Sequence, residues 1–361
     1  MNIKKSIQDL IPYPPGKPIE ELTREYGIQE VIKLASNENP IGPSPQALRA
    51  IRRALSNLHR YPDGSGYYLK QALARFLKLK PEQIVLGNGS NEIIELALRT
   101  FLRPGFEVLS PTPSFLVYGK AVQAMGGKSI LIPLKRFRID LDAILDRIGP
   151  RTQMIIINNP NNPTGTIIKR KEWERFLKAV PARIMILLDE AYIDFVEDPE
   201  CPLGVDYLNS SQPLLVIRTF SKAYGLAGLR IGYGLTQADL ADYINRVRQP
   251  FNVNSLAQAG ALGALNDQVF YENTRTLVRK GKKDLERGLE RLGLFYVPSE
   301  TNFILIRVPQ QAQAVYEAML KKGVIIRSMR SYDLGDYIRV NVGLPEENRR
   351  FLQVLKQVIE K

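Results

Sequence analysis

A single lysine, Lys222, stands among small and apolar residues in the stretch TFSKAYGLAGLRIGYG, which spans residues 219–234. An arginine, Arg230, follows eight positions later, and apolar runs flank the stretch on both sides. We therefore expect the stretch to lie inside the protein. Burying a cation costs several kcal/mol unless something compensates its charge. The stretch thus predicts a compensating group close to both side chains.

Three further segments present polar groups where a predicted strand ends. They are GNGSNE (87–92), NNPNNPTG (158–165) and LLDEAY (187–192). The second segment offers the amide of Asn162, and the third offers a carboxylate, Asp189, and a phenol, Tyr192. The first leads into a helix whose free N–H groups form a ready anion site. Together with Lys222, these segments offer an amine, a carboxylate, an amide, a phenol and an anion site.

Pyridoxal 5′-phosphate (PLP) is a ligand that uses all of these groups. Its aldehyde would condense with Lys222, and Asp189 would keep its pyridine nitrogen protonated, so that the ring can accept electrons. Asn162 and Tyr192 would hydrogen-bond its 3-oxygen. Its phosphate would be held by Gly89, Ser90, Asn91, Ser221 and Arg230. Imine formation would then compensate Lys222, and the phosphate would compensate the arginine.

Each motif taken alone also has an ordinary structural explanation. Lys222 could begin a helix and extend its ammonium group to water. Asp189 could be a helix N-cap, and GNGSNE is a common pattern of a turn followed by a cap. Their joint occurrence at successive strand ends favours the cofactor site, because independent features then agree.

The elements that must position these groups alternate along the chain. Strands are predicted at 83–87, 106–110, 128–134, 153–160, 183–190 and 213–221, and helices at 90–102, 115–126 and 169–180. Strands with continuous apolar runs are typical of a mostly parallel sheet that helices cover on both faces. Ligands of such α/β sheets bind beyond the carboxyl ends of the strands, where the motifs lie.

The pattern changes from about residue 239. Helices are predicted at 238–249 and over 255–292, followed by short strands and a last helix from Pro345. This order is typical of a second, smaller α+β domain. We therefore predict three parts: an N-terminal arm (1–32) that packs on the small domain or a partner subunit, a large PLP-binding domain (33–246), and a small domain (247–361).

The chain resembles the fold-type I PLP-dependent aminotransferases of the aspartate aminotransferase superfamily, and more closely the histidinol-phosphate aminotransferases. The similar segments run nearly from end to end: LASNENPIGPSP (34–45), RYPDGSG (60–66), NNPTG (161–165), DEAY (189–192), TFSKAYGLAGLRIGY (219–233) and IRVNVGLPEEN (338–348). The resemblance implies amino transfer from histidinol phosphate to 2-oxoglutarate, giving imidazole-acetol phosphate and glutamate in histidine biosynthesis. It also implies ping-pong kinetics, with Lys222 moving the proton.

The resemblance implies two aromatic contacts with the cofactor. Tyr61, in RYPDGSG, would reach the cofactor phosphate of a partner subunit, so that a homodimer shares its active sites. Phe115 would stack on the pyridine ring, where many relatives carry a tyrosine. This departure keeps the stacking and removes one hydroxyl group.

The resemblance also implies substrate contacts. Arg339 would bind a substrate anion, and Arg327 would help to bind the phosphate of histidinol phosphate. Both arginines are expected to end short strands that face the large domain. Tyr13 and Asn37 would also contact substrate. The two arginines could instead form ordinary surface ion pairs, and Tyr13 could simply anchor the arm.

Composition and charge narrow the classes of function that the protein can have. The chain has 361 residues and a formal net charge of +13, but its basic residues are spread out and form no dense block of the kind that binds nucleic acid. The start has no apolar run of a signal peptide, and the longest apolar run, Ile184–Leu188, has five residues. Cys201 is the only cysteine. We expect a cytoplasmic enzyme that binds no membrane, nucleic acid or metal.

Three other functions remain open. An aromatic amino acid aminotransferase or a threonine-phosphate decarboxylase would share most of these motifs. A DNA-binding regulator with the same fold is suggested only by the charge, and the chain has no room for a helix-turn-helix domain beside the complete enzyme.

Overall fold

The largest sheet carries the predicted strand ends. The computed structural model describes residues 2–13 and 16–360. Its seven-stranded sheet has the order β2 (Ile84–Gly87), β8 (Gly232–Leu235), β7 (Leu214–Thr219), β6 (Met185–Asp189), β5 (Thr152–Asn158), β3 (Glu107–Thr112) and β4 (Lys128–Pro133). Only β8 is antiparallel to its neighbours, β2 and β7. The other six strands therefore end at one edge, and the prediction of a mostly parallel sheet is confirmed.

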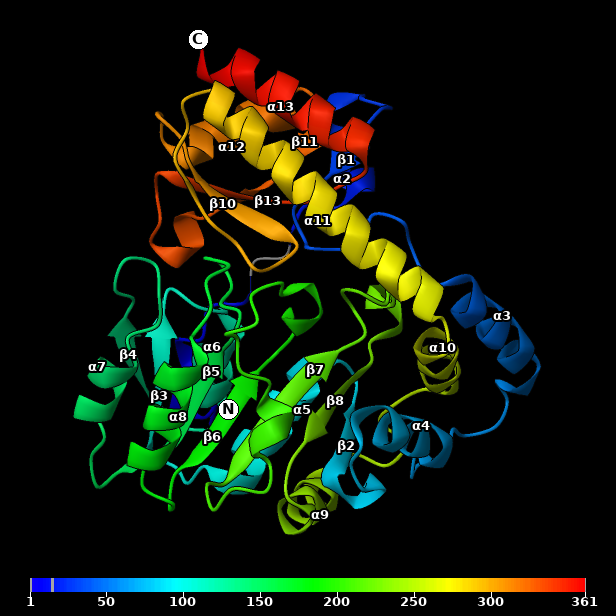
Figure 1. Ribbon diagram of the computed structural model, residues 1–361, viewed down its shortest axis with the longest axis vertical. Helices are drawn as coiled ribbons and strands as arrows, with labels where there is room; N and C mark the ends of the chain where they lie inside the picture. Colours follow the sequence, from blue (N-terminus) through cyan, green and yellow to red (C-terminus); the bar gives the residue numbers. More distant parts are fainter. Residues whose placement is uncertain (1, 14–15, 361) are drawn as a thin grey trace.

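Helices cover both faces of this sheet (Figure 1). The helices on one face are α5 (Ser90–Phe101), α6 (Val117–Ala124) and α9 (Ala238–Val247), and those on the other include α4 (Tyr67–Leu77), α7 (Leu141–Asp146) and α8 (Arg170–Ala179). In β6, Ile186 and Leu188 join one apolar cluster and Leu187 joins the other. A strand that is buried on both sides needs no polar alternation, which explains its continuous apolar sequence.

A second sheet lies beside the first and is antiparallel (Figure 1). Its order is β12 (Arg327–Ser328), β13 (Tyr337–Asn341), β10 (Phe303–Arg307) and β9 (Tyr296–Val297). Three helices accompany it: α11 (Gln268–Arg291), α12 (Ala312–Leu320) and α13 (Pro345–Ile359). The predicted helical stretch 255–292 is interrupted, since α10 (Ser255–Leu265) ends before the side chain of Asp267 caps α11. Helix α10 packs on α3 (Pro45–Ala54) and α4. The predicted domain boundaries remain a prediction.

The N-terminal segment packs next to the second sheet. It contains α1 (Lys5–Gln8) and α2 (Ile19–Tyr26), and it leads to β1 (Ile32–Lys33), which pairs in parallel with β11 (Val324–Ile325). Leu22 of α2 is fully buried against Ala35 and Ile325. Short 3₁₀ turns complete the structure at Leu55–Asn57, Pro81–Gln83, Ile193–Phe195, Gly204–Tyr207, Ala227–Leu229 and Arg330–Tyr332. Within the described ranges, none of the helices has the length and apolar character needed to cross a membrane.

Candidate active site

A cavity of about 550 Å³ opens at the carboxyl ends of the large sheet. Thirteen of the fifteen predicted site residues line it: Tyr13, Asn37, Ser90, Asn91, Phe115, Asn162, Asp189, Tyr192, Ser221, Lys222, Arg230, Arg327 and Arg339. They come from both sheets and from the N-terminal segment. The two that do not line it are Gly89, which lies directly behind it, and Tyr61.

Lys222 follows β7 by three residues, and its ammonium group faces the cavity. Its Nζ donates a hydrogen bond to the carbonyl oxygen of Ser36 at 3.1 Å. Burial lowers the pKa of Lys222 to about 8, and the nearby positive charge of Arg339 acts in the same direction. A lysine with a pKa near 8 is partly neutral at physiological pH, so this amine, which lines the cavity, can act as a nucleophile and as a base.

Asp189 is the last residue of β6 and is almost completely buried. Its Oδ2 accepts a hydrogen bond from the Tyr118 hydroxyl at 2.7 Å, and its Oδ1 accepts one from the backbone N–H of Ala191 at 3.0 Å. Burial raises the pKa of Asp189 to about 6, although the bond from Tyr118 opposes this shift. Such a carboxylate gains most from a protonated ring nitrogen placed beside it, because the positive charge replaces the lost hydration.

Tyr118 is a site residue that the sequence analysis missed. It lies on α6, three positions after Phe115, and its ring packs edge-on against the ring of that residue at 5.5 Å between centroids. The sequence predicted a helix from Phe115 onward, but α6 begins at Val117, so Phe115 precedes the helix that carries Tyr118. The contact with Asp189 was not visible, because it depends on how α6 packs on the sheet.

Tyr192 and Asn162 meet at the cavity wall as expected for groups that share one ligand oxygen. The Tyr192 hydroxyl accepts hydrogen bonds from Asn37 Nδ2 at 2.9 Å and from Asn162 Nδ2 at 3.4 Å. Arg339 donates from Nη1 to Asn162 Oδ1 and from Nη2 to the carbonyl oxygen of Ala35 at 2.9 Å. Burial raises the pKa of Tyr192 well above its usual range, so the phenol is neutral. Asn37 Oδ1 and Arg339 Nε are buried without a hydrogen-bond partner, which suits a site that binds a polar ligand.

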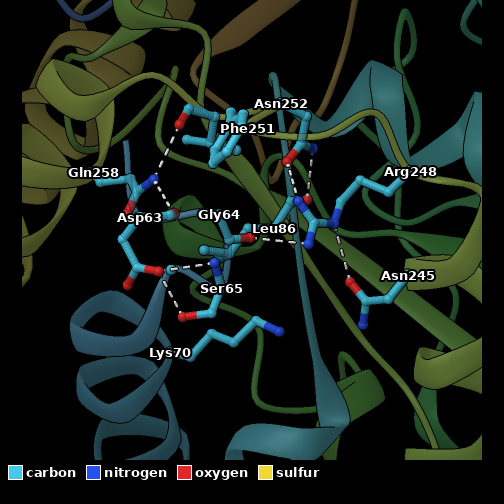
Figure 2. Close-up of a pocket in the computed structure, with 12 residues that line it drawn as sticks. Asp63, Gly64, Ser65, Lys70, Leu86, Asn245, Arg248, Phe251, Asn252 and Gln258 are labelled. Atoms are coloured by element: carbon cyan, nitrogen blue, oxygen red, sulfur yellow. Dashed lines mark hydrogen bonds between the residues drawn. The ribbon is translucent and has the colours of Figure 1, made fainter. Parts of the chain in front are cut away.

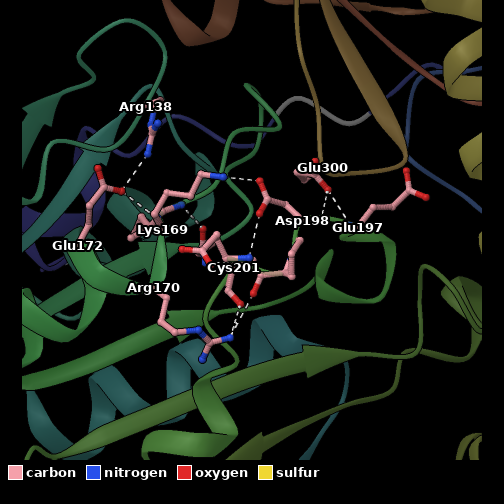
Figure 3. Close-up of polar contacts among 12 residues, drawn as sticks. Arg138, Lys169, Arg170, Glu172, Glu197, Asp198, Cys201 and Glu300 are labelled. Atoms are coloured by element: carbon pink, nitrogen blue, oxygen red, sulfur yellow. Dashed lines mark hydrogen bonds and ion pairs between the residues drawn. The ribbon is translucent and has the colours of Figure 1, made fainter.

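The loop that carries Asn162 contacts Ser299 and Glu300, which precede β10 of the second sheet. The N–H of Glu300 donates to the carbonyl oxygen of Gly165 at 2.8 Å. Gly165 has a φ of +76°, and a Cβ atom there would lie 2.2 Å from Ser299 Oγ, so the close approach requires glycine. Figure 3 shows Glu300 accepting a hydrogen bond from the backbone of Glu197 at 2.8 Å. These contacts tie the two halves of the cavity wall together.

The opposite end of the cavity has the composition of a phosphate site. Gly89 has a φ of +75° and begins α5, so the first N–H groups of that helix are available. The positive φ favours glycine here as well, and a Cβ atom would displace the Arg230 guanidinium, whose Nη2 would lie 2.6 Å away. Arg230 donates from Nη1 to the carbonyl oxygen of Ala227 at 3.0 Å and to Ser221 Oγ at 3.4 Å. Helix N–H groups, a hydroxyl group and a guanidinium group therefore converge.

Tyr13, Phe115 and Arg327 form the outer end. The rings of Tyr13 and Phe115 meet edge-on at 6.2 Å, and the Arg327 guanidinium lies 5.8 Å from the Tyr13 ring centroid. The expectation that both substrate arginines end strands is wrong. Arg327 begins β12 and Arg339 is the middle residue of β13, directly opposite it in the register. The run VIIRSM contributes to two different sheets, which moves Arg327 to the start of its own strand.

Tyr61 lies outside the cavity of its own chain. Its side chain is 82% exposed, and its ring stacks on Phe251 at 4.8 Å between centroids. A contact between Tyr61 and the cofactor of a partner subunit remains a prediction.

The residues fit PLP as a group. A partly neutral lysine, a buried carboxylate, a phenol with an amide, and an anion site line one cavity, and two of its lining residues, Asn37 and Arg339, each have a buried polar atom without a partner. Each functional group of the cofactor thus has a side chain of matching chemistry.

Comparisons with known proteins agree with this geometry. The family described as "Aminotransferase class I and II" matches residues 29–355. Histidinol-phosphate aminotransferase 2 of Pseudomonas fluorescens is 47% identical over 98% of this chain and 96% of its own length. Histidinol-phosphate aminotransferase of Desulfotalea psychrophila is 48% identical over 100% of this chain and 96% of its own length. Among solved structures, histidinol-phosphate aminotransferase from Sinorhizobium meliloti, in complex with pyridoxal-5′-phosphate, has a TM-score of 0.91 and 28% identity over 99% of this chain and 97% of its own. The chain belongs to the class I and II aminotransferases and, within them, to the histidinol-phosphate aminotransferases.

Proposed function

We propose that the protein is a PLP-dependent aminotransferase of histidine biosynthesis, which transfers the amino group of histidinol phosphate to 2-oxoglutarate. The products are imidazole-acetol phosphate and glutamate. The observation that carries the proposal is that Arg327 and Arg339 line the same cavity as Lys222 and Asp189. Two guanidinium groups beside an amine and a buried carboxylate are suited to an amino donor that carries an anion.

The bound cofactor supplies an aldehyde that joins to amines and a ring that withdraws electrons from them. Around it, Lys222 takes the proton from the reacting carbon of the substrate and returns it to the cofactor side. The lowered pKa of Lys222, about 8, keeps a fraction of this amine neutral near pH 7. Asp189 holds a proton on the ring nitrogen by its negative charge, and Tyr118 holds the carboxylate in place.

The other residues orient the cofactor. Asn162 and Tyr192 bind the ring oxygen, and Phe115 covers the ring face. Phosphate binding falls to the start of α5 and to side chains around it: Gly89, Ser90, Asn91, Ser221 and Arg230. The fixed geometry supports the reaction by keeping the reacting atoms aligned while two different substrates enter in turn.

The two substrate arginines bind different anionic groups of the substrate. Arg339 is 6% exposed and bonded to Asn162, so it meets the anionic group nearest to the chemistry. Arg327 lies at the outer end beside Tyr13 and meets the phosphate of the longer substrate. Tyr13 and Asn37 complete the substrate wall. A guanidinium fork can pair with a phosphate or a carboxylate, which allows one site to accept histidinol phosphate and glutamate.

The working unit is a cytoplasmic homodimer in which Tyr61 reaches the partner subunit's cofactor phosphate. The exposed ring of Tyr61, held by Phe251, supports this assignment. Mixed dimers of Tyr61→Phe and Lys222→Ala chains test it. If sites are shared, one site of each hybrid carries both changes and the other carries neither, so mixing restores activity to the Lys222→Ala protein. A fully active monomer in sedimentation would contradict the dimer.

The substrate assignment is tested by comparing kcat/KM for histidinol phosphate, histidinol and phenylalanine. A charge-assisted pair contributes roughly 1.5–3 kcal/mol, so loss of the substrate phosphate should lower kcat/KM about tenfold to a hundredfold. A preference for phenylalanine would identify an aromatic aminotransferase. Release of carbon dioxide from threonine phosphate would identify a decarboxylase. Less than about a threefold loss without the phosphate, small beside one charge-assisted pair, would contradict the specific substrate.

A further inference from the structure

A bridge of side chains joins the phosphate turn (87–92) to a distant surface loop (61–66). Asn252 is its central residue, and Figure 2 shows the side of the bridge that faces the loop, with Asn252, Arg248 and Gly64. Asn252 Nδ2 donates to Glu92 Oε2 at 2.6 Å and to the carbonyl oxygen of Leu86 at 3.1 Å. The same Glu92 oxygen accepts the backbone N–H of Asn88 at 2.6 Å. One carboxylate oxygen thus connects Asn252 to the residue that precedes Gly89.

Arg248 determines how the amide of Asn252 is turned. Its Nη1 donates to Asn252 Oδ1 at 2.9 Å, and its Nη2 donates to the carbonyl oxygen of Gly64 at 2.9 Å. A guanidinium can only donate, so it binds the oxygen of the Asn252 amide and leaves the nitrogen facing Glu92. Asn245 Oδ1 accepts from Arg248 Nε at 3.2 Å and steadies the guanidinium. Each hydrogen-bond donor of the bridge therefore faces an acceptor.

The loop at the other end of the bridge is itself held tightly. Asp63 accepts hydrogen bonds from the backbone N–H of Ser65 at 2.8 Å and of Tyr67 at 2.7 Å. A Cβ atom at Gly66 would lie 2.2 Å from Leu86 Cδ1, so the loop touches the end of β2 directly. The space enclosed between loop and bridge is about 10 Å³, which holds at most about one water molecule. The loop and the turn therefore form one unit.

The negative charge of Glu92 lies close to the expected phosphate site, and the bridge compensates part of it. Glu92 lies in the first turn of α5, where a phosphate would bind, and like charges at one site repel each other. Two hydrogen bonds to one of its oxygens orient the carboxylate toward Asn88 and Asn252 and partly compensate its charge. The same bonds connect the turn 87–92, whose residues Ser90 and Asn91 line the cavity, to Asn252.

We propose that Asn252, oriented by Arg248, is a positioning residue that holds Glu92 and the turn 87–92 in the conformation that binds the cofactor phosphate. The proposal rests on the proposed function for the identity of the ligand, and it adds a residue that does not line the cavity. The bridge acts on the phosphate end alone, because its contacts reach neither Lys222 nor Asp189.

The test compares the binding of PLP and of pyridoxal, which lacks the phosphate, to the apo form of Asn252→Ala. A hydrogen bond to a charged group contributes roughly 1.5–3 kcal/mol, so the Kd for PLP should rise at least about tenfold. The Kd for pyridoxal should change by less than about twofold, within the variation of a surface substitution. Asn252→Asp keeps the size of the side chain and should give the same selective loss, which protects the test if the alanine variant folds poorly.

Gln258→Ala is the matched control. Gln258 lines the same small space and bonds to the carbonyl oxygens of Asp63 and Val253, at 3.0 Å each, but not to the turn. It should leave the preference for PLP over pyridoxal unchanged. Equal losses of PLP and pyridoxal binding in Asn252→Ala, or no loss of either, would overturn the positioning role. If the unaltered protein itself binds PLP and pyridoxal equally, the phosphate site is wrong and the proposed function fails instead.

Discussion

The inner and outer ends of the cavity are built in different ways. At the inner end, Asp189 and Tyr192 are 3% and 5% exposed, and each is held by side chains from other elements. At the outer end, Tyr13 is 40% exposed and Arg327 begins a two-residue strand. The inner groups lie at or just after the end of β6, in the middle of the seven-stranded sheet, whereas the outer groups lie on the N-terminal segment and a small sheet. The groups nearest the expected chemistry are therefore more deeply buried than those at the outer end.

The largest effect is expected from a change at Lys222, on the inner side of this comparison. Lys222→Ala should lower turnover by at least about 10⁴-fold, because it removes both the covalent attachment and a general base. The visible absorption band of lysine-bound cofactor should disappear. Lys282→Ala is the control, since Lys282 is a buried lysine that donates to the carbonyl oxygen of Ser299 but does not line the cavity. A band that persists in the Lys222 variant would contradict the assignment.

Asp189→Asn should keep PLP bound and slow proton transfer roughly 10³-fold, as loss of a preorganised charge does in other enzymes. The apo protein should become more stable. Burial raises the pKa of Asp189 to about 6. The folded apo protein therefore loses stability as the pH rises through about 6, because the buried carboxyl group becomes charged. Melting curves of the apo proteins should therefore favour the asparagine variant by a few °C at pH 7 and converge near pH 4. Near-normal activity would mean that another group protonates the ring.

Substitutions at the outer end of the cavity should lower activity less than those at the inner end, and by different amounts for the two amino donors. Arg327→Ala should lower kcat/KM for histidinol phosphate about tenfold to a hundredfold, the value of one charge-assisted pair, with a smaller effect on glutamate. Arg339→Ala should lower both, because this side chain also holds Asn162. Steady-state kinetics with both donors measures the difference. Equal effects of Arg327→Ala on the two donors would show that it does not select the phosphate.

The smallest effect is expected for Tyr118→Phe, which leaves the buried charge in place. It removes a hydrogen bond that lowers the pKa of Asp189, so that pKa should rise further above about 6. Activity should fall less than about tenfold at pH 8, consistent with one hydrogen bond, and the acid limb of the pH profile should move to higher pH. Tyr207→Phe, which loses a bond to Glu174 elsewhere, should leave the profile unchanged. An unshifted acid limb in Tyr118→Phe would contradict this role.

The sequence predicted the inner end better than the outer end for a physical reason. Continuous apolar strands that end in a polar residue indicate both a buried sheet and the edge at which Asp189 and Lys222 appear. Strand β8 escaped prediction because GYGL is short and half glycine. The positions of Arg327 and Arg339 depend on a break at Ile326 that sends one run into two sheets. Tyr118 and Asn252 are invisible for a similar reason, since their partners are set by packing between elements that lie far apart in the chain.

The antiparallel strand β8 has a consequence for the order in which the protein folds. The loop that carries Lys222 and Arg230 connects β7 to its immediate neighbour β8, so it can close locally. The phosphate turn follows β2, whose partner in the sheet is also β8, where Gly87 pairs with Gly232. Contacts so distant in sequence form late, because chain entropy must be lost before they are made. During synthesis, β2 is therefore complete long before its partner leaves the ribosome. The turn 87–92 that follows β2 therefore reaches its final place in the sheet only after β8 has been added.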